Sequence, residues 1–160
     1  MFKYIGILLI SVSVSAYGTV MSKNIKKATA VRQEICQLLK EIENGIRYGS
    51  RPVIETVRSI NLPLLSASGF ITALSDENLP QNAVNSYLGM ISQQEKEKLY
   101  EFFSKLGKST YKEKELTLCS SCIVFFENIL KQSLKESASK ELLYKKIGII
   151  GGILAAIILI

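Results

Sequence analysis

The chain has 160 residues, which favours a single globular unit, and its formal net charge is +6. It contains no His, so the most common general base and metal ligand is missing and no Ser–His–Asp nucleophilic set can form. Three Cys cannot all pair within one chain, which argues against a disulfide framework. The basic residues form no stripe with interleaved aromatic residues, so nucleic-acid binding is not favoured.

The N-terminal segment, residues 1–21, is apolar or small with a single charge and is long enough to cross a membrane. Lys23, Lys26 and Lys27 follow at once, as is typical of a stop-transfer flank. A cleaved signal peptide with a mature N-terminus near Ala16 is the alternative. The apolar run continues beyond that site, which favours a retained membrane helix.

The next segment, residues 22–47, shows the spacing of an amphipathic helix. It can begin at Ser22 or run on directly from the N-terminal helix. Gly49 suits a left-handed cap and Pro52 suits a first helical position, so the sequence predicts a turn between two helices. The apolar positions are Ile25, Ala28, Val31, Ile35, Leu38, Leu39, Ile42 and Ile46.

The middle of the chain predicts several shorter helices. Their expected ranges are 53–60, 63–74 and 80–87. Gly69 weakens the second of these helices, because glycine is unfavourable inside a helix. Ser92 and Glu95 form a capping box that opens a further helix, which reaches Leu106 and is ended by Gly107.

A long final helix follows and is expected to run straight into the C-terminal apolar segment. Ser109 or Thr110 is expected to cap it. No segment of the chain shows a strand pattern. The expected apolar face of this final helix comprises Leu116, Leu118, Val124, Phe125, Ile129, Leu130 and Leu134.

The C-terminal segment, residues 147–160, has no charged side chain and follows directly after Lys145 and Lys146. At about 1.5 Å per residue it reaches only about 21 Å, so it can be a short span, a re-entrant segment or a buried helix. Leu142 and Leu143 extend it upstream, and lysine stems can reach the headgroups, which favours a span.

Both inner flanks are richer in Lys than the outer ends, which places the middle of the chain in the cytoplasm and both termini outside it. The predicted fold is therefore all-α. A cytoplasmic helical domain, residues 22–146, is flanked by transmembrane helices at residues 1–21 and 147–160. The lysines beside the spans are expected to contact anionic membrane lipid.

Cys119 and Cys122 form a CxxC motif, which can be a redox pair or half of a zinc site. Only Cys36 remains as a further soft ligand, and carboxylates replace it poorly in a structural zinc site. The motif also falls inside a predicted helix, whereas a redox pair usually lies at a helix N-terminus. We therefore expect two small apolar side chains that face the core, with no metal and no other cofactor.

Gly148, Gly152 and Ala156 repeat a small residue at every fourth position of the C-terminal segment. Such spacing lets two membrane helices approach closely, although small residues are also common in membrane helices in general. Leu106-Gly107-Lys108-Ser109 faintly resembles the end of a phosphate-binding loop, but it lacks the preceding glycine and the strand. A tight turn between two helices is the expected structure there.

Three motifs, in this order and spacing, resemble the family of stage III sporulation protein AB of endospore-forming bacteria. They are Ile46-Arg47-Tyr48-Gly49-Ser50-Arg51-Pro52, then Leu106-Gly107-Lys108-Ser109, then Lys146-Ile147-Gly148-Ile149-Ile150-Gly151-Gly152. The chain departs from the family pattern at Thr110, where Asp is usual, and at Lys114, where Gln is common.

The resemblance implies a non-enzymatic sporulation membrane protein, similar to the F-type platform proteins of type II secretion and type IV pilus machines. Such a protein would sit in the mother-cell membrane around the forespore, in a channel-like complex. Its expected partners are a secretion-type ATPase and other membrane subunits of the complex. The expected partner-contact residues are Arg51, Pro52, Gly107, Lys108 and Ser109. An exported, membrane-attached helical binding protein and a CxxC thiol–disulfide enzyme are the alternatives.

Overall fold

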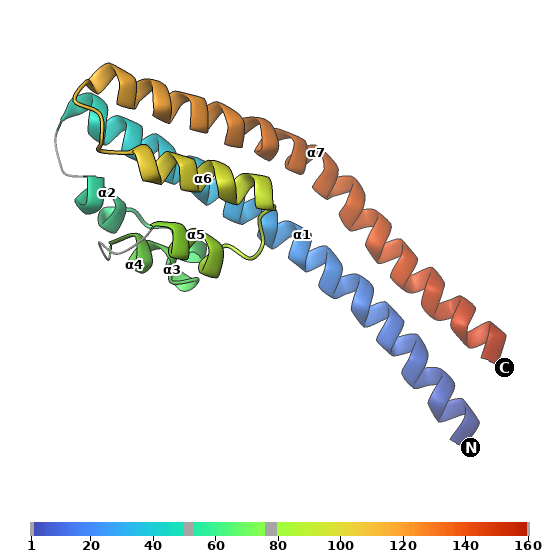
Figure 1. The fold of residues 1–160 in the computed structure, drawn as a ribbon. Helices are drawn as coiled ribbons and strands as arrows, with labels where there is room; N and C mark the ends of the chain where they lie inside the picture. The colour runs from blue at the N-terminus through green and yellow to red at the C-terminus, as the bar shows by residue number, and fades with distance from the viewer. Residues whose placement is uncertain (1, 50–52, 76–79, 160) are drawn as a thin grey trace. The chain divides into compact units, whose positions relative to one another are not determined.

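The computed structural model describes residues 2–49, 53–75 and 80–159 (Figure 1). Most side chains of residues 2–20, and some further along the chain, lie outside this description. Every regular element in the described part is a helix, so the all-α prediction is confirmed. The helices are α1 Phe2–Tyr48, α2 Val53–Ser59, α3 Pro63–Ala67, α4 Phe70–Ser75, α5 Pro80–Tyr87, α6 Gln93–Lys105 and α7 Lys112–Leu159.

The chain forms two compact units. Residues 30–131 make up the core unit, and residues 1–29 with 132–160 make up the terminal unit. The long helices α1 and α7 contribute to both units. The boundaries expected after residues 21 and 146 separate the predicted membrane helices from the predicted cytoplasmic domain. These boundaries stay predictions.

Helix α1 supplies one wall of the core unit. Val31, Ile35, Leu38, Leu39 and Ile42 are buried, as their spacing of three and four residues predicts. Helix α1 has no break at Ser22, where the sequence allowed a separate helix to begin. It runs on from the N-terminal segment as one element. Burying several large aliphatic side chains contributes about 1.5–3 kcal/mol each, which is how a helix of this length is held in place.

Helix α7 buries its predicted apolar face in part. The partly buried side chains are Leu116, Leu118, Phe125, Ile129 and Leu130, and three of them, Leu118, Phe125 and Leu130, pack against the core. Val124 and Leu134 are exposed, whereas Cys119, Cys122, Ile123 and Phe126 are buried. The prediction that Val124 and Leu134 face inward is therefore wrong. The buried positions are spaced three and four residues apart, so they lie on one face of the helix.

The predicted helix at residues 63–74 is two helices, α3 and α4, separated at Gly69. Gly69 has a φ of 84°, a left-handed conformation that glycine adopts without the steric penalty of a Cβ atom. The ring of Tyr87 in α5 packs over the same residue, and a Cβ atom placed there would lie 3.0 Å from its Cε1. Gly69 therefore serves both the turn and the close approach of α5.

The start of α3 is held by a carboxylate from α1. The residue at its N-cap, Leu62, has no side-chain acceptor, and the N–H groups of Leu64 and Leu65 donate to Glu34 instead. The donor–acceptor distances are 2.9 to 3.1 Å. Satisfying these otherwise unpaired N–H groups fixes the short helices against α1.

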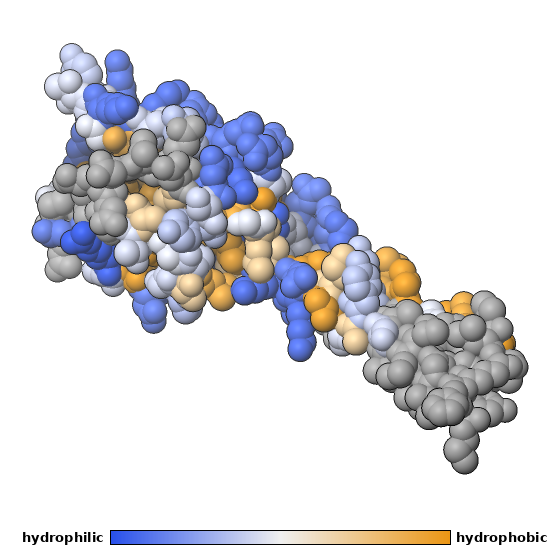
Figure 2. Space-filling model, turned by 60° about the horizontal axis from the view of Figure 1, so that its bottom comes forward, coloured by the Kyte–Doolittle hydropathy of each residue, from blue (hydrophilic) through white to orange (hydrophobic). Residues whose placement is uncertain are grey.

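The terminal unit consists of the first part of α1 and the last part of α7, which lie side by side (Figure 1). Its surface carries large apolar side chains, seen as orange atoms where the unit is described (Figure 2). More than half of each of the following side chains is exposed: Tyr17, Val20, Leu134, Leu142, Leu143, Ile147, Ile149, Ile150, Ile153, Leu154 and Ile157. Among the described residues, none of the helices offers an apolar stretch sufficient for a membrane crossing.

Candidate functional site

The α6–α7 connection, which holds the predicted contact residues Gly107, Lys108 and Ser109, lies beside the end of α1 (Figure 1). The Lys112 ammonium donates a hydrogen bond to the Arg47 carbonyl at 2.6 Å, which joins these two parts of the core unit. Tyr48 and Tyr111 flank this bond in sequence and are 74 % and 66 % exposed. We call Arg47, Tyr48, Lys108, Tyr111 and Lys112 the tip of the core unit.

Of the predicted contact residues, Gly107, Lys108 and Ser109 form the connection itself. Gly107 has a φ of 76° and ends α6 as predicted, although Leu106 occupies the formal C-cap position. The Ser109 hydroxyl accepts from the Tyr111 N–H at 3.3 Å and so shapes the turn locally. Lys108 is exposed. Arg51 and Pro52 lie outside the described residues.

The connection has none of the geometry of a phosphate-binding loop. Gly107 and Lys108 follow the C-terminus of α6, where unpaired carbonyl groups repel an anion. Helix α7 begins only at Lys112, so its first N–H groups are not directly preceded by the glycine. The tyrosine next to the helix start, Tyr111, is instead covered by the Lys114 ammonium, 5.3 Å from the ring centroid. A turn between two helices, as predicted, is what this segment forms.

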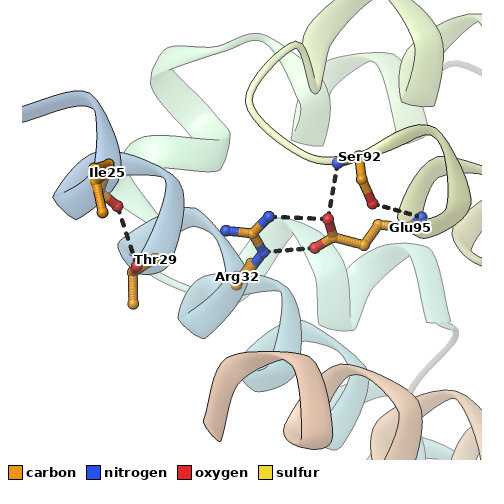
Figure 3. A network of polar contacts seen from close by, with 5 residues as sticks. All are labelled: Ile25, Thr29, Arg32, Ser92 and Glu95. Carbon is orange, nitrogen blue, oxygen red and sulfur yellow. Dashed lines mark hydrogen bonds and ion pairs between the residues drawn. The ribbon is translucent and has the colours of Figure 1, made fainter. Parts of the chain in front are cut away.

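A buried ion pair joins α1 to the start of α6 (Figure 3). Arg32 Nε lies 2.6 Å from Glu95 Oε1, and Arg32 Nη2 donates to Glu95 Oε2 at 2.9 Å, so the contact is bidentate. The predicted capping box is confirmed: Glu95 accepts from the Ser92 N–H, and the Glu95 N–H donates to the Ser92 hydroxyl. One carboxylate therefore caps α6 and clamps α6 to α1.

The charge of Glu95 is maintained by these contacts, although the side chain is almost fully buried. Burial by itself raises the pKa of a carboxyl group. Hydrogen bonds from Arg32 and Ser92 outweigh that effect and hold the pKa of Glu95 below its ordinary value. The sequence identified Glu95 only as a capping residue. Its partner Arg32, 63 positions away, carried no local signal beyond being a charged residue in a helix whose apolar face was already assigned.

The three cysteines are buried and free within the core unit. Burial is the main cause that raises the pKa of Cys36 and of Cys119 to about 11, and that of Cys122 to about 12. Thiols with such pKa values are protonated at neutral pH and are poor nucleophiles. The prediction that Cys119 and Cys122 face the core is confirmed. In the described part of the chain, no three His, Cys, Asp or Glu side chains come together as a metal site.

The residues predicted for membrane contact lie in the terminal unit. Lys23, Lys26, Lys27 and Lys146 are exposed, while the side chain of Lys145 is outside the description. Gly148, Gly152 and Ala156 all lie within α7, and their packing is likewise outside the description. Gly151, between the first two, is partly buried. Neighbouring large side chains of α7 are exposed, as noted above.

The fold and these sites define a class of protein: an all-α protein with a compact core unit, an exposed basic and aromatic tip, and a terminal unit with an apolar surface. The family model described as stage III sporulation protein AB matches residues 3–160. The chain therefore belongs to this family, which points to a role in sporulation. The resemblance stated from the three motifs is confirmed at the level of the family. No curated protein and no solved structure matches the chain.

Proposed function

We propose that the chain is a sporulation membrane protein that acts as a structural platform in a secretion-type channel complex between mother cell and forespore. Its two apolar ends anchor it in the mother-cell membrane, and its core unit contacts a cytoplasmic ATPase and other membrane subunits. The family match over residues 3–160, both apolar ends included, supports the sporulation role. The platform and channel roles extend the resemblance to F-type platform proteins.

The observation that carries the membrane part of this proposal is the exposed apolar surface of α7. Ile149, Ile153 and Ile157 are exposed by 60 %, 56 % and 64 %. Leaving a large aliphatic side chain in water rather than in an apolar environment costs about 1.5–3 kcal/mol. A surface with so many of them is stable only against an apolar surrounding. Lipid is the surrounding that fits a helix without charge on this face.

The exposed lysines support the proposed orientation. Lys23, Lys26 and Lys27 follow the N-terminal apolar segment, and Lys146 precedes the C-terminal one. Lysines concentrated on the inner flanks of two spans favour a cytoplasmic location for the segment between them. Their flexible stems let the ammonium groups reach anionic headgroups while the helix stays in the hydrocarbon.

The two long helices provide a physical route for coupling. Helices α1 and α7 each continue without a break from the terminal unit into the core unit. In the core unit the two helices are joined by an exposed Lys40–Glu127 ion pair of 2.6 Å, and the Arg32–Glu95 pair holds α1 to α6. In the proposed platform, a partner that binds the core unit would therefore contact helices that also extend into the membrane. This role requires no catalytic group.

A labelling experiment tests the proposed topology. The native thiols are buried, so a variant Asn61→Cys supplies an exposed cysteine in the core unit. We expect a membrane-impermeant maleimide to label it only after the cells are permeabilised. The native protein without the added cysteine is the control and should stay unlabelled in both conditions. Labelling in intact cells would exclude the cytoplasmic platform and favour the exported, membrane-attached binding protein.

Co-purification tests the coupling to an ATPase. We expect the ATPase of the complex to co-purify with the full chain from detergent-solubilised membranes of sporulating cells. The variant Lys108→Glu should reduce its yield, whereas Lys131→Glu, an exposed lysine of α7 in the same unit, should not. An ATPase that is absent from the purified wild-type complex would contradict the coupling. Arg51 and Pro52 remain candidate contacts that the same experiment can test.

A further inference from the structure

The tip of the core unit exposes two aromatic side chains that do not belong to its apolar core. Tyr48 is the last residue of α1, and Tyr111 directly precedes α7. Among the large apolar and aromatic side chains of the core unit that the structure describes, these two are the most exposed. Tyrosines with an exposed ring combine a large contact area with a hydroxyl group, and they are enriched at protein interfaces.

The tip holds these tyrosines on fixed backbone. The hydrogen bond from Lys112 to the Arg47 carbonyl connects the residue before Tyr48 with the residue after Tyr111. The Lys114 ammonium lies over the Tyr111 ring, and the Ser109 hydroxyl bonds the Tyr111 backbone. When a partner binds both rings, the backbone of the tip therefore loses little conformational freedom, which favours affinity.

Basic residues lie near the two rings in sequence, and two of them are paired with carboxylates. Arg47 is paired with Glu43 at 2.7 Å, and Lys105 is paired with Glu101 at 2.7 Å. Within the described residues, no ion pair joins a carboxylate to Lys108 or to Lys112. The Lys112 ammonium donates to a neutral carbonyl, that of Arg47. The first turn of α7 carries Glu113 and Glu115, where the helix N-terminus favours their charge.

We propose that the tip is a docking surface for an acidic face of a partner protein, with Tyr48 and Tyr111 as anchors and Lys108 and Lys112 as its charged rim. The inference deepens the proposed function, because it names the surface through which the chain meets its cytoplasmic partner. A tip-to-tip contact between two copies of the chain does not fit, since it would place the unpaired lysines of both tips together. The rim charges set orientation and association rate, and the rings supply most of the binding energy.

Site-specific photo-cross-linking tests this surface. The full chain carries p-benzoylphenylalanine in place of Tyr48 or of Tyr111, and membrane vesicles from sporulating cells are irradiated. We expect a protein adduct from both positions, with the attached peptide rich in Asp and Glu. Tyr100, on the exposed side of α6, is the control position and should give no such adduct. Raising the salt from about 0.1 M to about 1 M should lower the yield, since exposed charges are then screened.

Two charge variants sharpen the result. Lys108→Glu should lower the adduct yield from Tyr111 about tenfold, since it places a negative charge against an acidic partner. Lys131→Glu changes the net charge equally and should leave the yield unchanged. Helical circular dichroism of both variants verifies that they are folded.

Three results would overturn the docking surface: adducts only with lipid or a second copy of the chain, an attached peptide that is not acidic, or equal yields from Lys108→Glu and the wild type. If the ATPase co-purifies but the tip gives no protein adduct, the tip is wrong and the platform function stands. If the tip cross-links to an acidic protein that is not the ATPase, the docking surface stands and the proposed ATPase contact is wrong.

Discussion

The core unit and the terminal unit are built on the same two helices, but they treat apolar side chains in opposite ways. In the core unit Leu38, Leu39 and Phe126 are fully buried, and in the terminal unit Ile147 and Ile157 are mostly exposed. In the core unit, buried side chains of α2 to α6 join those of α1 and α7 in one apolar cluster. The same chemistry therefore stabilises the folded chain in one unit and leaves apolar surface exposed in the other.

The largest effect is expected from a pair of truncations, one in each unit. Phe126→Ala should lower the free energy of unfolding by about 3–5 kcal/mol, because it removes a fully buried ring that packs edge-to-face on Phe125. Ile153→Ala should change it by no more than about 0.5 kcal/mol, because that side chain is more than half exposed. Urea unfolding of both variants in detergent micelles, followed by circular dichroism, measures the difference. Equal losses would contradict the contrast between the units.

An effect of similar size is expected where the core unit buries charge. Arg32→Ala leaves the buried carboxylate of Glu95 without its partner and should cost about 3–5 kcal/mol. The matched control is Lys40→Ala, which breaks an ion pair whose two side chains are about half exposed and should cost about 0–1 kcal/mol. The same unfolding measurement compares them. A small loss in Arg32→Ala would mean that water or another group satisfies Glu95.

The dependence of this effect on pH follows from the sign of the pKa shift. In the wild type the folded-state pKa of Glu95 lies below its ordinary value of 4.5, so its contribution is complete above that value and is lost as pH falls through the folded pKa. In Arg32→Ala the burial of Glu95 acts without the offsetting arginine and should raise its pKa, so the variant gains relative stability in acid. The stability difference between the two proteins should therefore narrow from pH 7 to pH 4. A constant difference would contradict the assignment to Glu95.

A smaller effect is expected at two glycines of the core unit with similar backbone but different surroundings. Gly107→Ala should cost about 1–2 kcal/mol, because it meets only the strain of a positive φ. Gly69→Ala should cost about 2–3 kcal/mol, because its Cβ atom also contacts the Tyr87 ring. Thermal unfolding measures both variants. In a Tyr87→Ala background the two glycine substitutions should cost the same stability. If Gly69→Ala still costs more there, the Tyr87 ring is not the cause of the difference.

The smallest effect on stability is expected at the CxxC motif. Cys119→Ala and Cys122→Ala should each cost about 1 kcal/mol and leave assembly intact. At pH 8, iodoacetamide should leave the three native thiols unmodified, since that pH is well below pKa values of about 11 and 12, and should modify all of them in urea. Mass spectrometry counts the modified cysteines. Rapid modification of Cys119 or Cys122 in the folded protein would revive the thiol–disulfide function.

Much of the core unit was predictable because its signals are local. The apolar spacing of Val31 to Ile42, the capping box at Ser92 and the helix ends at Gly49 and Gly107 depend on neighbours within a turn or two. The tip was predictable only in part. The α6–α7 turn follows from Gly107, whereas the exposure of Tyr48 and Tyr111 depends on which helices cover them.

The sequence by itself determined the helices, most of their ends, the buried face of α1 and the inward direction of the CxxC pair, since periodicity and capping act over a few residues. Only the tertiary structure decided that Arg32 meets Glu95, that Glu34 caps α3, and that α7 buries Phe126 and exposes Val124. These contacts join segments far apart in the chain. Several side chains of each helix compete for the same space, and packing between helices selects among them in a way that no local pattern encodes.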